Sequence, residues 1–251
     1  MKKLFEKFFK KKKKYTSFDN EDKDTLSHYQ ILKLIHNCFN PKTYLEIGVQ
    51  QGRSINLTNI KTLAIGIDPF KDDDIVFNKN IKMFHIESDD FFKNYDVCKK
   101  FENKKIDVAL IDGMHLFDFV LRDFINVEKN CHKNSIILLH DTIPIDKISS
   151  ERINSNGAWT GDVYKIIPIL KKYRPDLKIY NISIPPIGVC LVYNLNPDSD
   201  ILEKNYDNIY QEYINMTYDD IKDNLEEKLS ILSLNLQDIK NLLEQELKIS
   251  F

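Results

Sequence analysis

The sequence has few cysteines and no long apolar run, and both shortages narrow the classes of protein to which it can belong. Cys38, Cys98, Cys131 and Cys190 are far apart, and none forms a Cys-x-x-Cys pair. Four cysteines are too few to stabilise a chain of 251 residues through disulfide bonds, so we expect reduced thiols and a cytoplasmic protein. The longest apolar runs, such as residues 108–111, have the length of a strand, whereas a membrane helix needs about 20 residues. The sequence therefore predicts no membrane-spanning segment.

The sequence also lacks an excess of charge of one sign. Its 36 basic and 38 acidic residues give a formal net charge of −2. Binding to nucleic acid through a global field is therefore not expected. The exception is the N-terminus, where a lysine run over residues 1–15 includes Leu4, Phe5, Phe8 and Phe9 at helical spacing. This segment is either a solvated, frayed end or a basic amphipathic helix on an anionic membrane surface, and the first is the simpler interpretation.

Apolar segments of two kinds alternate along the middle of the chain. Near-helical apolar spacing predicts a helix over residues 25–39, which Asn40-Pro41 ends. Strand-like runs then alternate with helical stretches, at residues 43–47, 62–67, 81–86, 106–111 and 135–139. Alternation of this kind requires crossover connections and so predicts a parallel sheet.

The sheet is predicted to end in a hairpin. Strand-like segments at residues 177–184 and 189–194 are separated by Pro185-Pro186-Ile187-Gly188, a link short enough for an antiparallel pair. The predicted fold is α/β, with a Rossmann-like, mostly parallel sheet of seven strands and helices on both faces.

Two segments outside this alternation have features of their own. Residues 142–160 show little periodicity, and a loop of that length predicts an active-site flap. Trp159 either packs in the protein interior or covers a bound substrate. Asp162 is predicted to be the N-cap of the next helix. From Ile201 onward an apolar stripe at three- and four-residue steps indicates a long helix for a homodimer or coiled coil, or one folded back on its domain. The stripe consists of Ile221, Leu225, Leu229, Leu232, Leu236, Ile239, Leu243 and Leu247.

The first predicted strand runs into a glycine-marked turn. Residues 44–54 contain the pattern Glu-x-Gly-x-x-x-Gly-x-Ser, formed by Glu46, Gly48, Gly52 and Ser54. Glycines at such a turn let backbone amides approach a ligand closely, and the turn is predicted to start a helix. A dinucleotide site would instead show Gly-x-Gly-x-x-Gly, with a middle glycine that leaves room for pyrophosphate.

The second strand is followed by Asp68. In open α/β sheets, a carboxylate at the end of this strand can bind the hydroxyls of a ribose. With the glycine pattern, this residue makes the sequence resemble class I S-adenosylmethionine-dependent methyltransferases. The resemblance implies that Glu46 and the glycine loop, including Ser54, face the methionine part of the cofactor. It also implies that Asp68 binds the ribose and that Ser88 and Asp89, after the third strand, line the adenine side.

Polar residues also end the fourth and fifth predicted strands. Residues 106–111 lead into Asp112-Gly-Met-His115, and residues 135–139 lead into His140-Asp141. Because adjacent parallel strands end at one edge of a sheet, Asp112, His140 and Asp141 can converge beside the cofactor. Oxygen ligands and an imidazole with open positions form a site suited to a divalent metal. In the alternative interpretation, the two aspartates cap loops and His140 is a buried histidine with satisfied hydrogen bonds.

This second pattern resembles the metal-dependent O-methyltransferases, including the branch with sugar O-methyltransferases and cephalosporin-hydroxylase-like proteins. The resemblance implies that Asp112 and Asp141 bind the metal, with His140 as a further ligand, and that His115 is the catalytic base. Many relatives have an acidic residue in place of His140, which is a softer ligand than Mg²⁺ prefers. Mg²⁺, Mn²⁺ and iron therefore all remain candidates, as does a site without metal.

Together these patterns predict S-adenosylmethionine-dependent methyl transfer to a hydroxyl of a small molecule or sugar. The alternatives are an oxygenase or hydroxylase on the same fold, or a non-catalytic binding protein. The resemblance extends over residues 44–194. We therefore divide the chain into a tail that is basic and then acidic at 1–24, a methyltransferase-like catalytic domain at 25–197, and a helical extension at 198–251.

Overall fold

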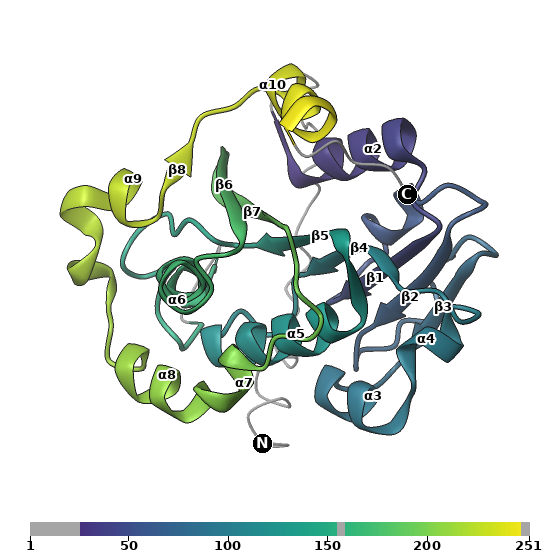
Figure 1. The fold of residues 1–251 in the computed structure, drawn as a ribbon, viewed down its shortest axis with the longest axis horizontal. Coiled ribbons are helices and arrows are strands. Elements are labelled where there is room, and N and C mark those ends of the chain that lie inside the picture. Colours follow the sequence, from purple (N-terminus) through teal and green to yellow (C-terminus); the bar gives the residue numbers. More distant parts are fainter. Residues whose placement is uncertain (1–25, 155–158, 247–251) are drawn as a thin grey trace.

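A sheet of eight strands forms the centre of the molecule, in the order β3-β2-β1-β4-β5-β7-β6-β8 (Figure 1). The computed structural model describes residues 26–154 and 159–246. β1 to β5 are parallel, β7 is antiparallel to both of its neighbours, and β8 pairs with β6 in parallel. The strands are β1 (Thr43–Ile47), β2 (Leu63–Ile67), β3 (Ile81–Phe84), β4 (Ile106–Ile111), β5 (Cys131–His140), β6 (Lys178–Ile184), β7 (Ile187–Tyr193) and β8 (Ile231–Leu232).

Helices cover both faces of this sheet (Figure 1). α3 to α8 contribute to a hydrophobic core on one face, and α2 and α10 contribute to a second core on the other. The helices are α2 (His28–Phe39), α3 (Ser88–Asn94), α4 (Val97–Lys100), α5 (Phe117–Lys129), α6 (Ile166–Tyr173), α7 (Ile201–Lys204), α8 (Tyr206–Tyr213), α9 (Leu225–Lys228) and α10 (Leu236–Asn241). The predicted α/β fold with helices on both faces and an antiparallel hairpin is confirmed.

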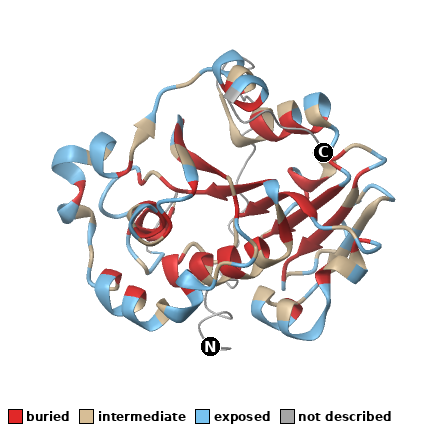
Figure 2. Ribbon diagram, viewed as in Figure 1, coloured by how far each residue is buried: buried red, intermediate tan, exposed pale blue. Residues whose placement is uncertain are grey.

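The central strands are continuous apolar runs because both of their faces are covered (Figure 2). Every residue of β1 and of β4 is buried. Alternation along β1 sends Leu45 and Ile47 into the core beneath α5 and sends Tyr44 into the core beneath α2. The same alternation places Glu46 on the Tyr44 side, where its carboxylate is fully buried.

Three predictions about local structure were wrong. The sheet has eight strands rather than seven, because the two residues of β8 extend its edge beside β6. The turn after β1 leads only into a short 3-10 turn, Ile55–Leu57, and not into a helix. The apolar stripe after Ile201 is divided among short elements that include α9, β8 and α10, and it supplies residues to both cores. Homodimer formation through a long C-terminal helix therefore loses its structural basis and stays an untested prediction.

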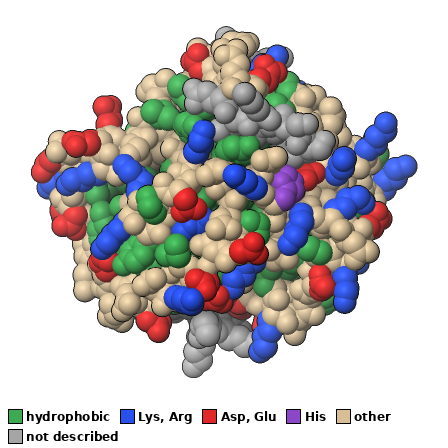
Figure 3. Space-filling view, viewed as in Figure 1, with side chains coloured by type: hydrophobic (Ala, Val, Ile, Leu, Met, Phe, Trp, Pro, Cys, Tyr) green, Lys and Arg blue, Asp and Glu red, His purple; other side chains and the backbone are tan. Residues whose placement is uncertain are grey.

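The described residues also test the predictions about membrane-spanning segments and surface charge. Within 26–154 and 159–246, no helix combines the length and apolarity that a bilayer crossing requires. On the face shown in Figure 3, basic and acidic side chains are intermixed. The predicted tail at 1–24, with its proposed membrane contact, lies outside the described residues.

A buried ion pair joins α5 to the residue that follows α6. Arg174 follows α6, and its guanidinium donates two hydrogen bonds, of 2.6 and 2.9 Å, to the Glu128 carboxylate on α5. Their side chains are only 1% and 4% exposed. Breaking such a pair is costly because the remaining charge stays buried without a partner.

We predict that Arg174→Met lowers the free energy of unfolding by about 3 to 5 kcal/mol, measured by urea denaturation. Lys172→Met is the control, since Lys172 lies on α6 and forms an exposed pair with Glu212. A loss no larger than that of the control would contradict the prediction.

Candidate active site at the ends of β4 and β5

The polar ends of β4 and β5 meet at one edge of the sheet. The two strands pair in parallel, with Ile111 opposite Leu139, so the residues that follow are neighbours. Asp112 comes directly after β4, and Asp141 comes directly after His140, the last residue of β5. The predicted convergence of these residues is therefore present in the structure.

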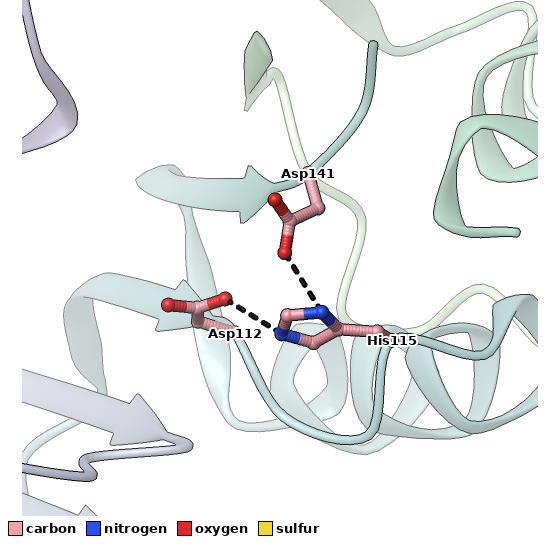
Figure 4. A group of neighbouring side chains, drawn as sticks. All are labelled: Asp112, His115 and Asp141. Carbon is pink, nitrogen blue, oxygen red and sulfur yellow. Dashed lines mark ion pairs between the residues drawn. The ribbon is translucent and has the colours of Figure 1, made fainter. Parts of the chain in front are cut away.

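His115 lies between the two carboxylates (Figure 4). Its Nε2 is 3.4 Å from Asp112 Oδ1, and its Nδ1 is 3.0 Å from Asp141 Oδ2. Atoms of these three residues that could bind a metal lie within 4.8 Å of one another. His140 adjoins them, with its Nδ1 3.0 Å from Asp112 Oδ1 and 3.8 Å from Asp141 Oδ2. The residues predicted as metal ligands and the residue predicted as base thus form one cluster.

Two members of the cluster have an unusual backbone. The φ angle is 54° at His115 and 60° at Asp141, in the left-handed region that residues with a Cβ rarely adopt. Two glycines pack against the same segments. A Cβ on Gly48 would lie 2.0 Å from the Asp112 carbonyl oxygen, and a Cβ on Gly161 would lie 1.8 Å from that of His115. Strained residues held by close backbone packing are typical of functional sites.

The carboxylates and imidazoles of this cluster, which are buried or partly buried, strongly affect one another. Burial would raise the pKa of Asp112, but the charges and hydrogen bonds of His140 and His115 outweigh it and hold this pKa well below its usual range. Burial would lower the pKa of both histidines, yet Asp112 and Asp141 raise the pKa of His140 to about 9 and that of His115 well above its ordinary value. The two aspartates therefore create a site that favours a positive charge.

Trp159, near the end of the predicted flap, packs against this cluster. The Trp159 ring stacks on the His115 ring, with the centroids 5.2 Å apart and the planes inclined by 17°. His115 Nδ1 is also 3.0 Å from the Trp159 carbonyl oxygen. Because a carbonyl oxygen only accepts hydrogen bonds, Nδ1 carries a hydrogen, and Nε2 is the nitrogen that can exchange a proton.

Arg152, in the predicted flap, forms ion pairs with two aspartates outside it. Its guanidinium donates to Asp162 Oδ2 at 2.8 Å and to Asp118 Oδ1 at 2.7 Å. Asp162 also accepts a hydrogen bond from the backbone amide of Phe117, the first residue of α5. Asp162 has the predicted N-cap position of the next helical segment, but its side chain makes no cap bond there and instead accepts from the start of α5.

The second predicted site lies at the ends of β1 and β2. Asp68 accepts hydrogen bonds from the backbone amides of Gln50, at 2.7 Å, and Phe70, at 2.8 Å. This carboxylate therefore joins the glycine turn to the loop after β2. Gly52 faces the side chain of Phe77, whose nearest atom would lie 2.8 Å from a Cβ at that position.

Several residues predicted to bind the cofactor contact other protein groups. The Glu46 carboxylate accepts hydrogen bonds from Tyr44 Oη at 2.7 Å and from Ser54 Oγ at 2.5 Å. Burial is the main reason that the pKa of Glu46 is raised to about 8. Asp89 pairs with Arg122 through atoms 3.1 Å apart. Ser88 begins α3, which follows β3 after the three residues 85–87.

One residue of the cluster was missed from the sequence. His28 is the first residue of α2, and its ring centroid lies 4.2 Å from that of His140. Burial, followed by the charge of His140, lowers the pKa of His28 to about 4. The sequence offers no signal for this contact, because the leading helix is far from the strand ends along the chain.

We predict that Asp112→Asn lowers the pKa of His140 from about 9 in metal-free protein, as measured by NMR of the imidazole resonances. The same change reduces stability at neutral pH. A raised histidine pKa stabilises the fold fully below the unfolded value of 6.5, and this contribution is lost as the pH rises through about 9. His36 is the internal control, because burial alone lowers its pKa to about 4. An unchanged His140 titration would contradict the prediction.

Comparisons with known proteins agree with this geometry. Residues 45–142 match a family model described as a methyltransferase domain. No curated protein matches by sequence. The O-methyltransferase TomG from Streptomyces achromogenes, solved in complex with S-adenosylmethionine, is similar with a TM-score of 0.53 and 14% identity over 71% of this chain and 85% of TomG. Cofactor-bound Rv0187 from MTB has a TM-score of 0.53 and 12% identity over 68% of this chain and 82% of that protein. Residues 45–142 are therefore similar to a methyltransferase domain, and the chain has the fold of TomG and Rv0187.

Proposed function

We propose that this chain transfers the methyl group of S-adenosylmethionine to a hydroxyl oxygen of a small molecule or sugar. The observation that carries the proposal is the convergence of Asp112, Asp141 and His115 within 4.8 Å at the edge of the sheet where the glycine turn also lies. The match to TomG supports the same reaction class, since TomG is an O-methyltransferase solved with this cofactor. In an open α/β sheet, ligands bind outside the carboxyl ends of the strands.

The residues at the ends of β1 to β3 fit the cofactor. A carboxylate has about four lone-pair positions, and Asp68 uses two of them for the amides of Gln50 and Phe70, so it can still accept bonds from ribose hydroxyls. We place the methionine part beside the turn at Gly48, which lets the backbone of Asp112 approach closely. The hydrogen bond from Ser54 to Glu46 holds this turn. We place the adenine near Ser88 and Asp89. S-adenosylmethionine supplies the methyl group as a sulfonium.

The donor set at β4 and β5 fits a divalent cation. Asp112 and Asp141 offer carboxylate oxygens, and the raised pKa values of both neighbouring histidines show that the site favours positive charge. His140 adds a nitrogen donor to this set. A cation such as Mg²⁺ or Mn²⁺ held here would lower the pKa of an acceptor hydroxyl that it contacts.

Asp112 and Asp141 raise the pKa of His115 in the absence of a cation, and a cation held by these carboxylates would offset that effect. The neutral imidazole of His115 would then be suited to take the proton of that hydroxyl. The Trp159 carbonyl oxygen and Asp141 both accept from Nδ1, which leaves Nε2 as the basic atom. Methyl transfer from sulfur to oxygen is an in-line displacement, so the acceptor must be held in one orientation. The Trp159 ring, stacked on His115, forms a flat wall that can restrict the acceptor and exclude water.

The binding half of the proposal predicts that Asp68→Ala weakens the affinity for S-adenosylhomocysteine at least about tenfold in calorimetry. Two hydrogen bonds to a charged group are lost, and 1.4 kcal/mol corresponds to a factor of ten. Asp73→Ala is the control, because Asp73 lies in the same loop region and pairs with Lys71 on the surface. Equal affinities in both variants would count against the binding model.

The chemical half predicts that His115→Gln lowers turnover by about 10²- to 10⁴-fold while the affinity for S-adenosylhomocysteine is retained. The readout is transfer of a labelled methyl group to candidate hydroxylated acceptors, with and without chelator. His132→Gln is the matched control, since His132 contacts Asp107 near the start of β4 and β5. Retained turnover in His115→Gln would contradict the role as base, and turnover that resists chelation would contradict the metal.

A further inference from the structure

Asp141 is an extra residue in the chain at the point where β5 ends. His140 pairs with Val189 of β7, and the amide of Thr142 donates to the Gly188 carbonyl oxygen at 3.3 Å. Consecutive residues of β7 thus meet residues that have Asp141 between them, as in a β-bulge. The φ angle of 60° at Asp141 is the left-handed value found at the first residue of one kind of bulge. The direction of the Asp141 carboxylate therefore depends on how this bulge is held.

A buried hydrogen bond holds the residue after Asp141. A residue with a Cβ keeps a left-handed backbone only where its surroundings fix it. Thr142 is fully buried, and its Oγ1 donates to Asn181 Oδ1 at 2.7 Å. The Asn181 amide nitrogen donates in turn to the Leu229 carbonyl oxygen at 3.0 Å. Because a carbonyl oxygen only accepts, Asn181 must turn its own oxygen toward Thr142, and the Thr142 hydroxyl must be the donor.

These hydrogen bonds connect the C-terminal extension to the candidate site. Asn181 lies on β6 opposite Ile231 of β8, and Leu229 directly follows α9. Asn181 and Leu229 are both fully buried, so each loss of a partner would leave a polar group without water. At the other end of the connection, Asp141 Oδ2 is 3.0 Å from His115 Nδ1 (Figure 4). The C-terminal extension is thus linked through two side chains to the segment that presents Asp141.

We propose that Thr142 and Asn181 are positioning residues of the cation site. They hold the bulge that directs the Asp141 carboxylate toward His115, and through them the C-terminal extension supports the site. Both side chains act through Asp141 rather than on a reactant. This inference rests on the proposed function, in which Asp141 is a ligand of the cation.

The test compares variants that differ by one hydroxyl. Thr142→Val keeps the shape of the side chain but leaves Asn181 Oδ1 without its donor, whereas Thr142→Ser keeps the hydroxyl. The whole chain, treated with EDTA, is titrated with Mn²⁺ by calorimetry, without cofactor or acceptor. We expect Thr142→Val to weaken Mn²⁺ binding about tenfold or more, as the loss of groups that orient metal ligands usually does. Thr142→Ser should restore most of the affinity.

Thr62→Val is the matched control. Thr62 is 1% exposed, and its Oγ1 donates to the Pro41 carbonyl oxygen at 2.7 Å, just before β2 at the other end of the sheet. Urea denaturation should show that both Thr→Val variants lose stability, because each loses a buried hydrogen bond. Only Thr142→Val should lose Mn²⁺ affinity. Asn181→Leu, which removes the acceptor of the Thr142 hydroxyl, serves as a second variant and should lower the affinity to a similar extent.

A second readout requires no cation. NMR at a single pH compares the ring resonances of His115, which should shift in Thr142→Val and stay near their wild-type positions in Thr142→Ser and Thr62→Val. Wild-type Mn²⁺ affinity and wild-type His115 resonances in Thr142→Val would overturn the inference, as would an equal loss of affinity in Thr62→Val. If the wild type itself binds no Mn²⁺, the proposed cation fails, and the His115 resonances alone decide this inference.

Discussion

The close approach of two carboxylates at neighbouring strand ends, one buried and one partly buried, is the constraint on which the rest of the site depends. Asp112 and Asp141 have the same charge, and burial deprives them of the water that would screen it. Such a pair is tolerable only with positive charge beside it, and the imidazoles of His115 and His140 supply hydrogen bonds and charge to both. The demand for a cation, the perturbed histidines and the proposed acceptor chemistry all follow from this arrangement.

The scaffold holds this arrangement by backbone packing as much as by side chains. Gly48 lies against the Asp112 carbonyl, and Gly161, directly after the flap, lies against the His115 carbonyl. The glycine turn and the end of the flap therefore each pack against one residue of the cluster. Arg152 then ties the flap to the start of α5 through Asp162. A change in the flap would therefore reach the cluster directly, because His115 also contacts Trp159.

Most strands could be predicted because two-sided burial requires unbroken apolar runs, which are visible in a sequence. The bounds of β1 and β4 agree with the prediction. β8 could not be predicted, since two residues form no pattern and are in a strand only because the edge of β6 is there to pair with them. Apolar spacing along the C-terminal stripe could not decide between a dimer helix and a helix folded back on its domain, because it cannot show that short elements share these residues between two cores.

The sequence alone determined the fold class and the identity of the polar residues that end the strands, because parallel strands must deliver their carboxyl ends to one edge. It also indicated Asp112, His115, His140, Asp141 and Asp68 as the residues of interest. Only the tertiary structure decided that His115 lies between the two carboxylates and that His28 stands beside His140. Those contacts depend on how a loop and a separate helix pack against the sheet, and no local pattern in the chain encodes packing between distant segments.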